Sequence, residues 1–160
     1  GELVAVAEAI GAGNLPEPVM AVAGVAAPLL ARAAADHGGT AGWLADVVSG
    51  ERIAALAHAE PEAGYDRSFV ATKAAREGAR WRLDGLKSAV EAGGAAGFIV
   101  TASGPDGLTA FLVDRDAPGL SVTPFRSVDG RTLADLRLEG VRVSEAARLQ
   151  TIGEAEVDEA

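Results

Sequence analysis

The hydrophobic positions at the start of the chain recur at helical spacing. Leu3, Ala7 and Ile10 fall on one face of a helix, which the small residues at 11–14 end. A second helix follows, and its apolar face consists of Val19, Val22, Ala26, Leu29 and Leu30. Pro28 lies inside this pattern and predicts a kink or the start of a new helical segment, because proline cannot donate a backbone hydrogen bond.

A third helix and a change of period come next. Thr40 suits its N-cap and Gly50 its end, with apolar positions at Trp43, Leu44, Val47 and Val48. After residue 50 the hydrophobic period falls from about 3.6 residues to 2, which is typical of strands. We expect strands at 53–59, 68–73, 80–83, 97–101, 108–113, 120–124, 133–139 and 141–143, with turns at 77–78, 84–85, 104–107 and 117–119.

Short strands separated by turns predict a β-sandwich or barrel. The pattern becomes helical again from Glu145. The predicted fold class is therefore α+β: a helical N-terminal segment, an antiparallel β-barrel or sandwich as the middle domain, and the start of a C-terminal helix. The predicted boundaries are 1–52, 53–145 and 146–160.

The composition of the chain excludes several classes of partner and of chemistry. The net charge of -9 argues against nucleic acid and against anionic membrane surfaces as partners, since both attract basic patches. The sequence has no cysteine, which excludes a thiol nucleophile and favours a cytoplasmic compartment. Its two histidines cannot make a zinc site alone, so we predict no metal. The nearly uncharged residues 19–31 are too short to span a bilayer and are expected to form a buried helix.

The chain is organised around residues 57–66, where helical patterns give way to strands. Pro61 fixes its own φ and disfavours a helical Glu60, while Gly64 permits a positive φ. Such a loop of small residues suits a ligand cradle. A plain linker between two domains has the same chemistry, and local chemistry alone favours the linker.

Several segments, in order, resemble the acyl-CoA dehydrogenase family. Leu44 with residues 49–51 is similar to the family's "WLP…SGE", residues 57–66 to "TEPxAGSD", residues 81–87 to "YxLNGxKxWIT", residues 110–113 and 118–122 to "AFLVxxxxPGxxV", and residues 137–143 to "LxFxxVxVP". Each segment is short, but the shared order runs from about residue 2 to residue 150. An unrelated small β-domain that binds a ligand through residues 57–66 would leave this order unexplained.

The resemblance implies a helical domain, a β-barrel-like middle domain and a C-terminal four-helix bundle. This chain is similar to the second part of the helical domain plus the β-domain. Family members use FAD to oxidise the Cα–Cβ bond of an acyl-CoA thioester, in fatty acid or steroid side-chain metabolism. Their catalytic carboxylate usually lies in the C-terminal bundle. We therefore predict no catalytic residue here, and we interpret Glu60 as a structural carboxylate bonded to nearby amides.

Matching the family's flavin positions gives the predicted cofactor-binding residues His58, Ala59, Gly64, Tyr65, Ala89 and Glu91. Four of them depart from the family pattern, which has Thr at 59, Ser at 65, Trp at 89 and Thr at 91. Ala59 lacks a hydroxyl, and Ala89 lacks a stacking surface. Tyr65 adds bulk, and Glu91 would place negative charge beside a ring that becomes more negative on reduction.

Two functional hypotheses remain open. In the first, the chain is a fragment or subunit of an FAD-dependent acyl-CoA dehydrogenase, binds acyl-CoA and is inactive alone. In the second, it is a degenerate, non-catalytic subunit, similar to the companion chains of unlike-pair enzymes in actinobacteria. Both predict a homo- or hetero-oligomer with another acyl-CoA dehydrogenase chain. FAD is the implied cofactor, although backbone amides would have to hold it where side chains differ.

Overall fold

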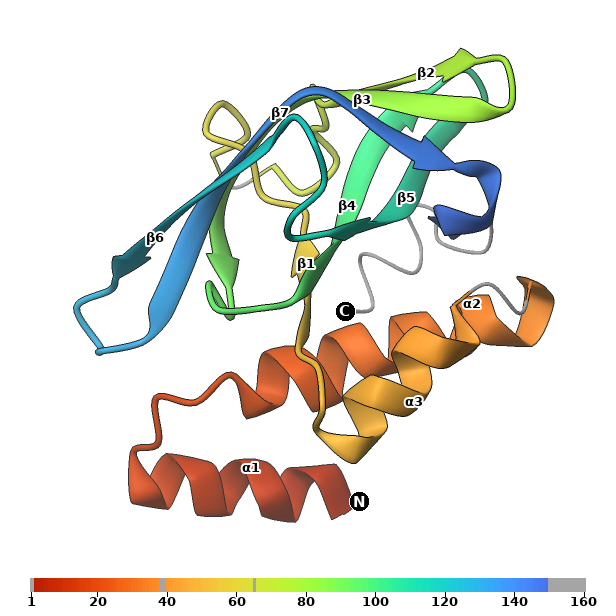
Figure 1. Cartoon of the computed structure of the whole chain (residues 1–160). Helices are drawn as coiled ribbons and strands as arrows, with labels where there is room; N and C mark the ends of the chain where they lie inside the picture. The colour runs from red at the N-terminus through yellow and green to blue at the C-terminus, as the bar shows by residue number, and fades with distance from the viewer. Residues whose placement is uncertain (1, 38–39, 65, 150–160) are drawn as a thin grey trace.

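A computed structural model of the chain describes residues 2–37, 40–64 and 66–149 and places four helical segments before a sheet (Figure 1). The helical segments are α1 (Glu2–Gly13), the π-helix η1 (Met20–Ala26), α2 (Ala27–His37) and α3 (Ala41–Ser49). The change from π- to α-helix falls just before Pro28, so the predicted new segment is confirmed. Gly50 ends α3 with a φ of 80°, as expected of a glycine cap.

One eight-stranded sheet follows the helices in the described part of the chain. Its strands are β1 (Ala54–Ala57), β2 (Lys73–Glu77), β3 (Arg80–Glu91), β4 (Gly97–Gly104), β5 (Gly107–Asp114), β6 (Leu120–Arg126), β7 (Thr132–Ser144) and β8 (Arg148–Leu149). The order is β6-β7-β3-β2-β4-β5-β8, with β1 beside β4. The pairings are antiparallel except that β1 and β2 each run parallel to β4. The α+β prediction is confirmed.

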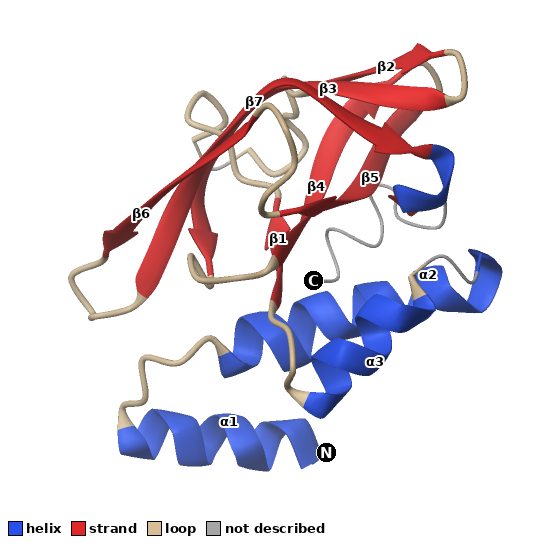
Figure 2. Cartoon of the chain, in the orientation of Figure 1, coloured by secondary structure: helices blue, strands red, loops and turns tan. Residues whose placement is uncertain are grey.

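Two hydrophobic cores share the central strands β4 and β5. Phe98 and Val100 of β4 belong to the core enclosed by the sheet itself, together with Phe111 of β5. Their neighbours Ile99 and Leu112 face the other way, into a core formed with the helices. This alternation follows from the period of 2 in a strand, and it makes β4 buried on both faces. Figure 2 shows the helices gathered on one side of the sheet.

The predicted turn at residues 84–85 is wrong. β3 continues through both residues to Glu91, and its pairing with β7 shifts register between Leu83 and Gly85. A Cβ on Gly85 would lie 2.7 Å from Thr72 Cα, so only glycine fits this bulge. The Asp84 carboxylate, the other turn signal, instead accepts a hydrogen bond from the Gly140 N–H at 2.8 Å.

Two other segments differ from expectation. Residues 68–72 are irregular and strand β2 begins only at Lys73, because the N–H groups of Ala71 and Thr72 donate to the Glu60 carboxylate. After β7, the expected helix begins as one 3-10 turn, η2 (Glu145–Ala147), and residues 148–149 then pair with β5 as a strand. Residues 150–160 lie outside the described part of the chain. In the described part, no helix is long and apolar enough to cross a membrane.

Candidate functional site

A pocket of about 560 Å³ lies between the helical layer and the sheet, and we call it the interlayer pocket. Its helical wall consists of Leu3, Met20, Ala21, Gly24 and Val25, and its sheet wall of Leu56, His58, Ala59, Arg67 and residues 88–91. Its volume is within the range of small-molecule and cofactor sites, and most of its lining is apolar. Three separate stretches of sequence are needed to form the sheet wall alone.

Four of the predicted site residues meet in this pocket: His58, Ala59, Ala89 and Glu91. The first two follow strand β1, and the last two lie near the end of β3. The Ser88 N–H donates to the Ala59 carbonyl at 2.9 Å and joins the two segments. Gly64 lies in an exposed turn with a φ of 57° and does not line the pocket. Tyr65 lies outside the described residues.

The end of β3 has an unusual backbone at the pocket. Ala89 has a φ of 51°, a left-handed conformation that is uncommon for a residue with a side chain. The pairing with β7 shifts register between Lys87 and Val90, so Ala89 lies in a bulge. Its N–H donates to the Asp135 carboxylate at 3.0 Å, which holds the bulge in place. Bulges re-aim side chains next to binding sites, and this one brings Ser88 and Ala89 to the pocket wall.

Behind the sheet wall lies a buried ion pair, in which the Lys87 ammonium is 2.7 Å from the Glu60 carboxylate. Glu60 also accepts hydrogen bonds from the N–H groups of Ala71 at 2.7 Å and Thr72 at 3.0 Å. Its interpretation as a structural carboxylate is therefore confirmed. Burial alone would raise the pKa of Glu60, but the hydrogen bonds from Lys87 and Thr72 outweigh burial and lower this pKa.

Lys87 has an acceptor for each of its three N–H groups. Besides Glu60, they are the His58 carbonyl at 3.1 Å and the Thr101 hydroxyl at 3.0 Å. Burial lowers the pKa of Lys87 to about 8, although the Glu60 carboxylate opposes this shift. The ammonium thus connects β3, β4 and the segment after β1 at a single point behind the pocket.

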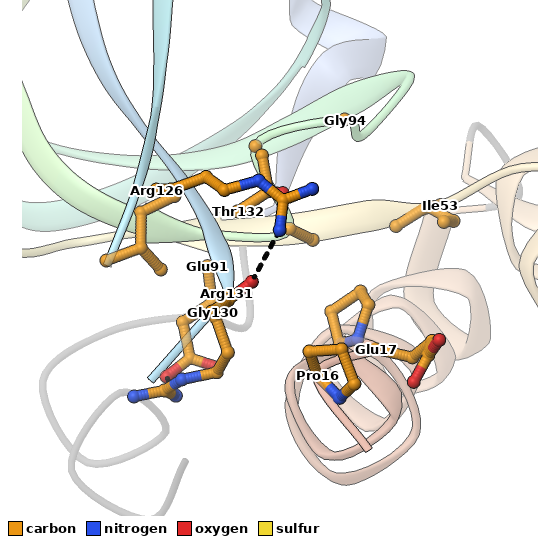
Figure 3. Close-up of a pocket in the computed structure, with 13 residues that line it drawn as sticks. Pro16, Glu17, Ile53, Glu91, Gly94, Arg126, Gly130, Arg131 and Thr132 are labelled. Atoms are coloured by element: carbon orange, nitrogen blue, oxygen red, sulfur yellow. Dashed lines mark hydrogen bonds and ion pairs between the residues drawn. The ribbon is translucent and has the colours of Figure 1, made fainter. Parts of the chain in front are cut away.

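The charge of Glu91 is offset by an arginine. Its carboxylate forms an ion pair with the Arg131 guanidinium at 2.8 Å. Arg131 lines a second pocket of about 300 Å³, in which Pro16 and Glu17 face the β6–β7 hairpin (Figure 3). Glu91 contributes to both pockets, but Arg131 does not line the interlayer pocket. Arg131 therefore offsets part of the expected charge at position 91 from the side of the second pocket, since it also pairs with the Asp129 carboxylate at 2.7 Å.

The helical wall of the site could not be read from motifs. Met20 and Gly24 belong to the π-helix, and Leu3 to α1, and the sequence marks them only as members of apolar helices. On the sheet wall, Arg67 and Ser88 were also missed, although both adjoin predicted site segments. Within the described residues that line the pocket, Glu91 is the one carboxylate. The described residues contain no group of three or more side chains that could hold a metal ion.

The chain thus combines an α+β fold with a pocket of ligand-binding size between its helices and a bulged sheet. The family model "Acyl-CoA dehydrogenase, middle domain" matches residues 55–141. This match covers more than half of the chain, and the chain therefore belongs to the acyl-CoA dehydrogenase family.

Curated relatives agree with this assignment. Isobutyryl-CoA dehydrogenase of Dictyostelium discoideum is 34% identical over 49% of this chain and 20% of its own length. Cyclohexane-1-carbonyl-CoA dehydrogenase of Geobacter metallireducens is 33% identical over 67% of this chain and 31% of its own length. The chain thus spans under a third of the length of these relatives.

Solved structures share the fold. A glutaryl-CoA dehydrogenase from Mycobacterium smegmatis in complex with FADH2 superposes with a TM-score of 0.70 and 28% identity, over 75% of this chain and 32% of that chain. The ChsE4-ChsE5 complex from Mycobacterium tuberculosis superposes with a TM-score of 0.73 and 28% identity, over 88% of this chain and 37% of that chain.

Proposed function

We propose that this chain forms the β-domain wall of an FAD and acyl-CoA site within a larger acyl-CoA dehydrogenase assembly. The interlayer pocket is the observation that carries the proposal. It brings together the two segments, around residues 58–59 and 88–91, that match the family's flavin loops. The isobutyryl-CoA and glutaryl-CoA dehydrogenases named above support an acyl-CoA thioester as the substrate class.

The residues present fit the flat, apolar part of a flavin. Ala59 and Ala89 are small and leave the wall open, and the Arg131 guanidinium offsets the Glu91 charge that would oppose a reduced ring. Polar contacts are fewer, because the N–H groups of Ser88 and Ala89 already have acceptors within the chain. The polar side chains of the pocket lining are those of His58, Arg67, Ser88 and Glu91.

When bound, the flavin would supply the acceptor for the hydride that leaves the β-carbon. The contribution of this chain is to orient that ring and to exclude water with the apolar side chains of the helical wall. A carboxylate must remove the α-proton. Glu91 is ion-paired with Arg131 at 2.8 Å and Glu60 with Lys87 at 2.7 Å, so neither is placed as that base. We therefore propose that the base comes from outside residues 2–149.

A non-catalytic subunit is the second candidate. The absence of a hydroxyl at Ala59 and of an aromatic ring at Ala89 favours it, since both changes remove contacts that the family's flavin loops would make. The similarity to a complex of two differently named chains, ChsE4 and ChsE5, also supports an unlike partner. In this role the β-domain is retained for assembly, and the partner holds the cofactor.

The visible absorption spectrum of the purified chain separates these proposals. Flavin at one equivalent per chain, alone or after addition of FAD, supports a working cofactor wall. A colourless chain that forms a complex with an acyl-CoA dehydrogenase partner, with about one flavin per pair of chains, supports the non-catalytic subunit. If neither the chain alone nor its complex with a partner binds flavin or acyl-CoA, both proposals are wrong.

Substitution of Ala89 by Trp sharpens this test. If the flavin wall is degenerate, Ala89→Trp restores the stacking surface and tightens FAD binding. Ala75→Trp is the matched control, because Ala75 is an exposed residue of β2 that does not line the pocket. Equal FAD affinity of the wild type and Ala89→Trp would show that position 89 does not limit binding.

A further inference from the structure

A series of three hydrogen bonds links Lys87 to the pocket wall. It joins Lys87 Nζ to Thr101 Oγ1 at 3.0 Å, Thr101 Oγ1 to His58 Nδ1 at 3.0 Å, and His58 Nε2 to the Arg67 carbonyl at 2.7 Å. An ammonium can only donate, and a carbonyl oxygen can only accept. The direction of the two outer bonds is therefore determined by chemistry, and the bond between Thr101 and His58 depends on where the hydroxyl proton of Thr101 points.

His58 Nε2 must carry a proton, because the Arg67 carbonyl has none to offer. The Thr101 hydroxyl accepts from Lys87, so its own proton is directed at His58 Nδ1, the nearer of its two remaining partners. The other partner is the Ala57 carbonyl at 3.4 Å. Nδ1 is then an acceptor and the ring is the neutral Nε2–H tautomer.

A second proton on His58 would reverse the middle bond of this series. Nδ1 would become a donor, and the Thr101 hydroxyl would have to turn to the more distant Ala57 carbonyl. The ring would also become a cation two hydrogen bonds away from the buried Lys87 ammonium. Thr101 is fully buried, so its hydroxyl must find an acceptor within the protein.

We infer that Lys87 is a positioning residue that, through Thr101, keeps His58 neutral with its proton on Nε2, so that the wall of the interlayer pocket gains no charge from this ring. The charged groups facing His58 are Lys87 and Arg67, which disfavour its protonation, and Glu60, which favours it. Burial is the largest cause of the shift and lowers the pKa of His58, and the Lys87 and Arg67 cations lower it further. This role is independent of flavin binding.

The inference is tested by nitrogen NMR of ¹⁵N-labelled protein without added ligand. The sequence contains two histidines, so His37→Gln assigns the His58 signals. The wild type is expected to show the Nε2–H tautomer. Lys87→Met removes the buried cation and releases the Thr101 hydroxyl to accept from Nδ1–H, which raises the pKa of His58 by about one pH unit.

Arg137→Met is the matched control. It removes the same unit of charge from an ion pair of the same 2.7 Å length, but that pair, with Glu139, is exposed. The control should leave the tautomer and pKa of His58 unchanged. If Lys87→Met leaves Glu60 buried without a partner and does not fold, the Glu60→Gln/Lys87→Met double variant replaces it and should give a smaller rise, because the Glu60 charge that favours protonation of His58 is also removed.

Thr101 variants show whether the effect passes through the hydroxyl. In a Thr101→Val background, Lys87→Met should shift the pKa of His58 less, because no hydroxyl remains to accept from Nδ1–H. Thr101→Ser keeps the hydroxyl and should restore the full shift. An Nδ1–H tautomer in the wild type, or an unchanged His58 pKa in the folded Lys87 variants, would overturn the inference.

Discussion

The contact between α3 and the sheet depends on the absence of a side chain at Gly97. A Cβ built there would lie 2.5 Å from Trp43 Cη2, 2.9 Å from Trp43 Cζ2 and 3.1 Å from the Val113 carbonyl oxygen. The shortest distance is 0.9 Å below the 3.4 Å of an ordinary contact. Trp43 packs against the core between helices and sheet, so the ring cannot move without disturbing α3.

We therefore expect Gly97→Ala to lower the free energy of unfolding by about 2 kcal/mol, the usual cost of overpacking, and the melting temperature by about 6 °C. Gly94→Ala is the matched control, because a Cβ at Gly94 meets nothing within 4 Å. It should be neutral or slightly stabilising, since alanine loses less chain entropy than glycine on folding.

Urea unfolding followed by far-ultraviolet circular dichroism measures both variants. Trp43→Leu makes room beside β4 for the added methyl group. The double variant Trp43→Leu/Gly97→Ala should therefore lose less free energy of unfolding than the sum of the losses of the two single variants. If Gly97→Ala is as stable as Gly94→Ala, or if the two costs are additive, the indole does not pack on Gly97.

Three further outcomes follow from the contacts. Trp81→Phe should cost about 1 to 2 kcal/mol in urea unfolding, because it removes the 2.9 Å hydrogen bond from Trp81 Nε1 to the Glu145 carboxylate; an unchanged midpoint would contradict that bond. The pKa of Lys87 is lowered from 10.5 to about 8, so between these pH values the unfolded chain binds more protons and the free energy of unfolding rises with pH; Lys87→Met should lose this rise. Arg131→Met breaks a half-exposed ion pair with Glu91 and should change the free energy of unfolding by less than about 1 kcal/mol. A larger loss would show that solvent screens this pair less than its exposure indicates.

Much of the fold could be predicted from local patterns. Apolar residues at helical spacing predicted the helices before residue 50, and the change to a period of 2 predicted the sheet that follows. The structural role of Glu60 was predicted from the family resemblance, but its backbone partners Ala71 and Thr72 lie eleven and twelve residues further along the chain. Where a prediction from the sequence was wrong, the local structure depends on a contact with a residue distant along the chain. The Asp84-Gly85 pair has turn chemistry, yet Gly140 and Thr72 engage these residues and keep β3 continuous.

The candidate site shows the same division. Motifs located the sheet wall at His58, Ala59, Ala89 and Glu91, and the structure brings all four to one pocket. They could not predict the left-handed Ala89, because its bulge depends on pairing with β7 and on the Asp135 carboxylate. Nor could the motifs show that Arg131, forty residues further along, pairs with Glu91.

By itself, the sequence determined the order of helices and strands and the family, because periodicity and short motifs are local properties. The tertiary structure decided which side chains meet: the helical wall of the pocket, the ion pair of Glu60 with Lys87, and the contact of His58 with Thr101. These depend on the packing of η1, α2 and α3 against the sheet and on the bulges of β3. No local pattern records such contacts, because their energies arise only when distant segments exclude water together.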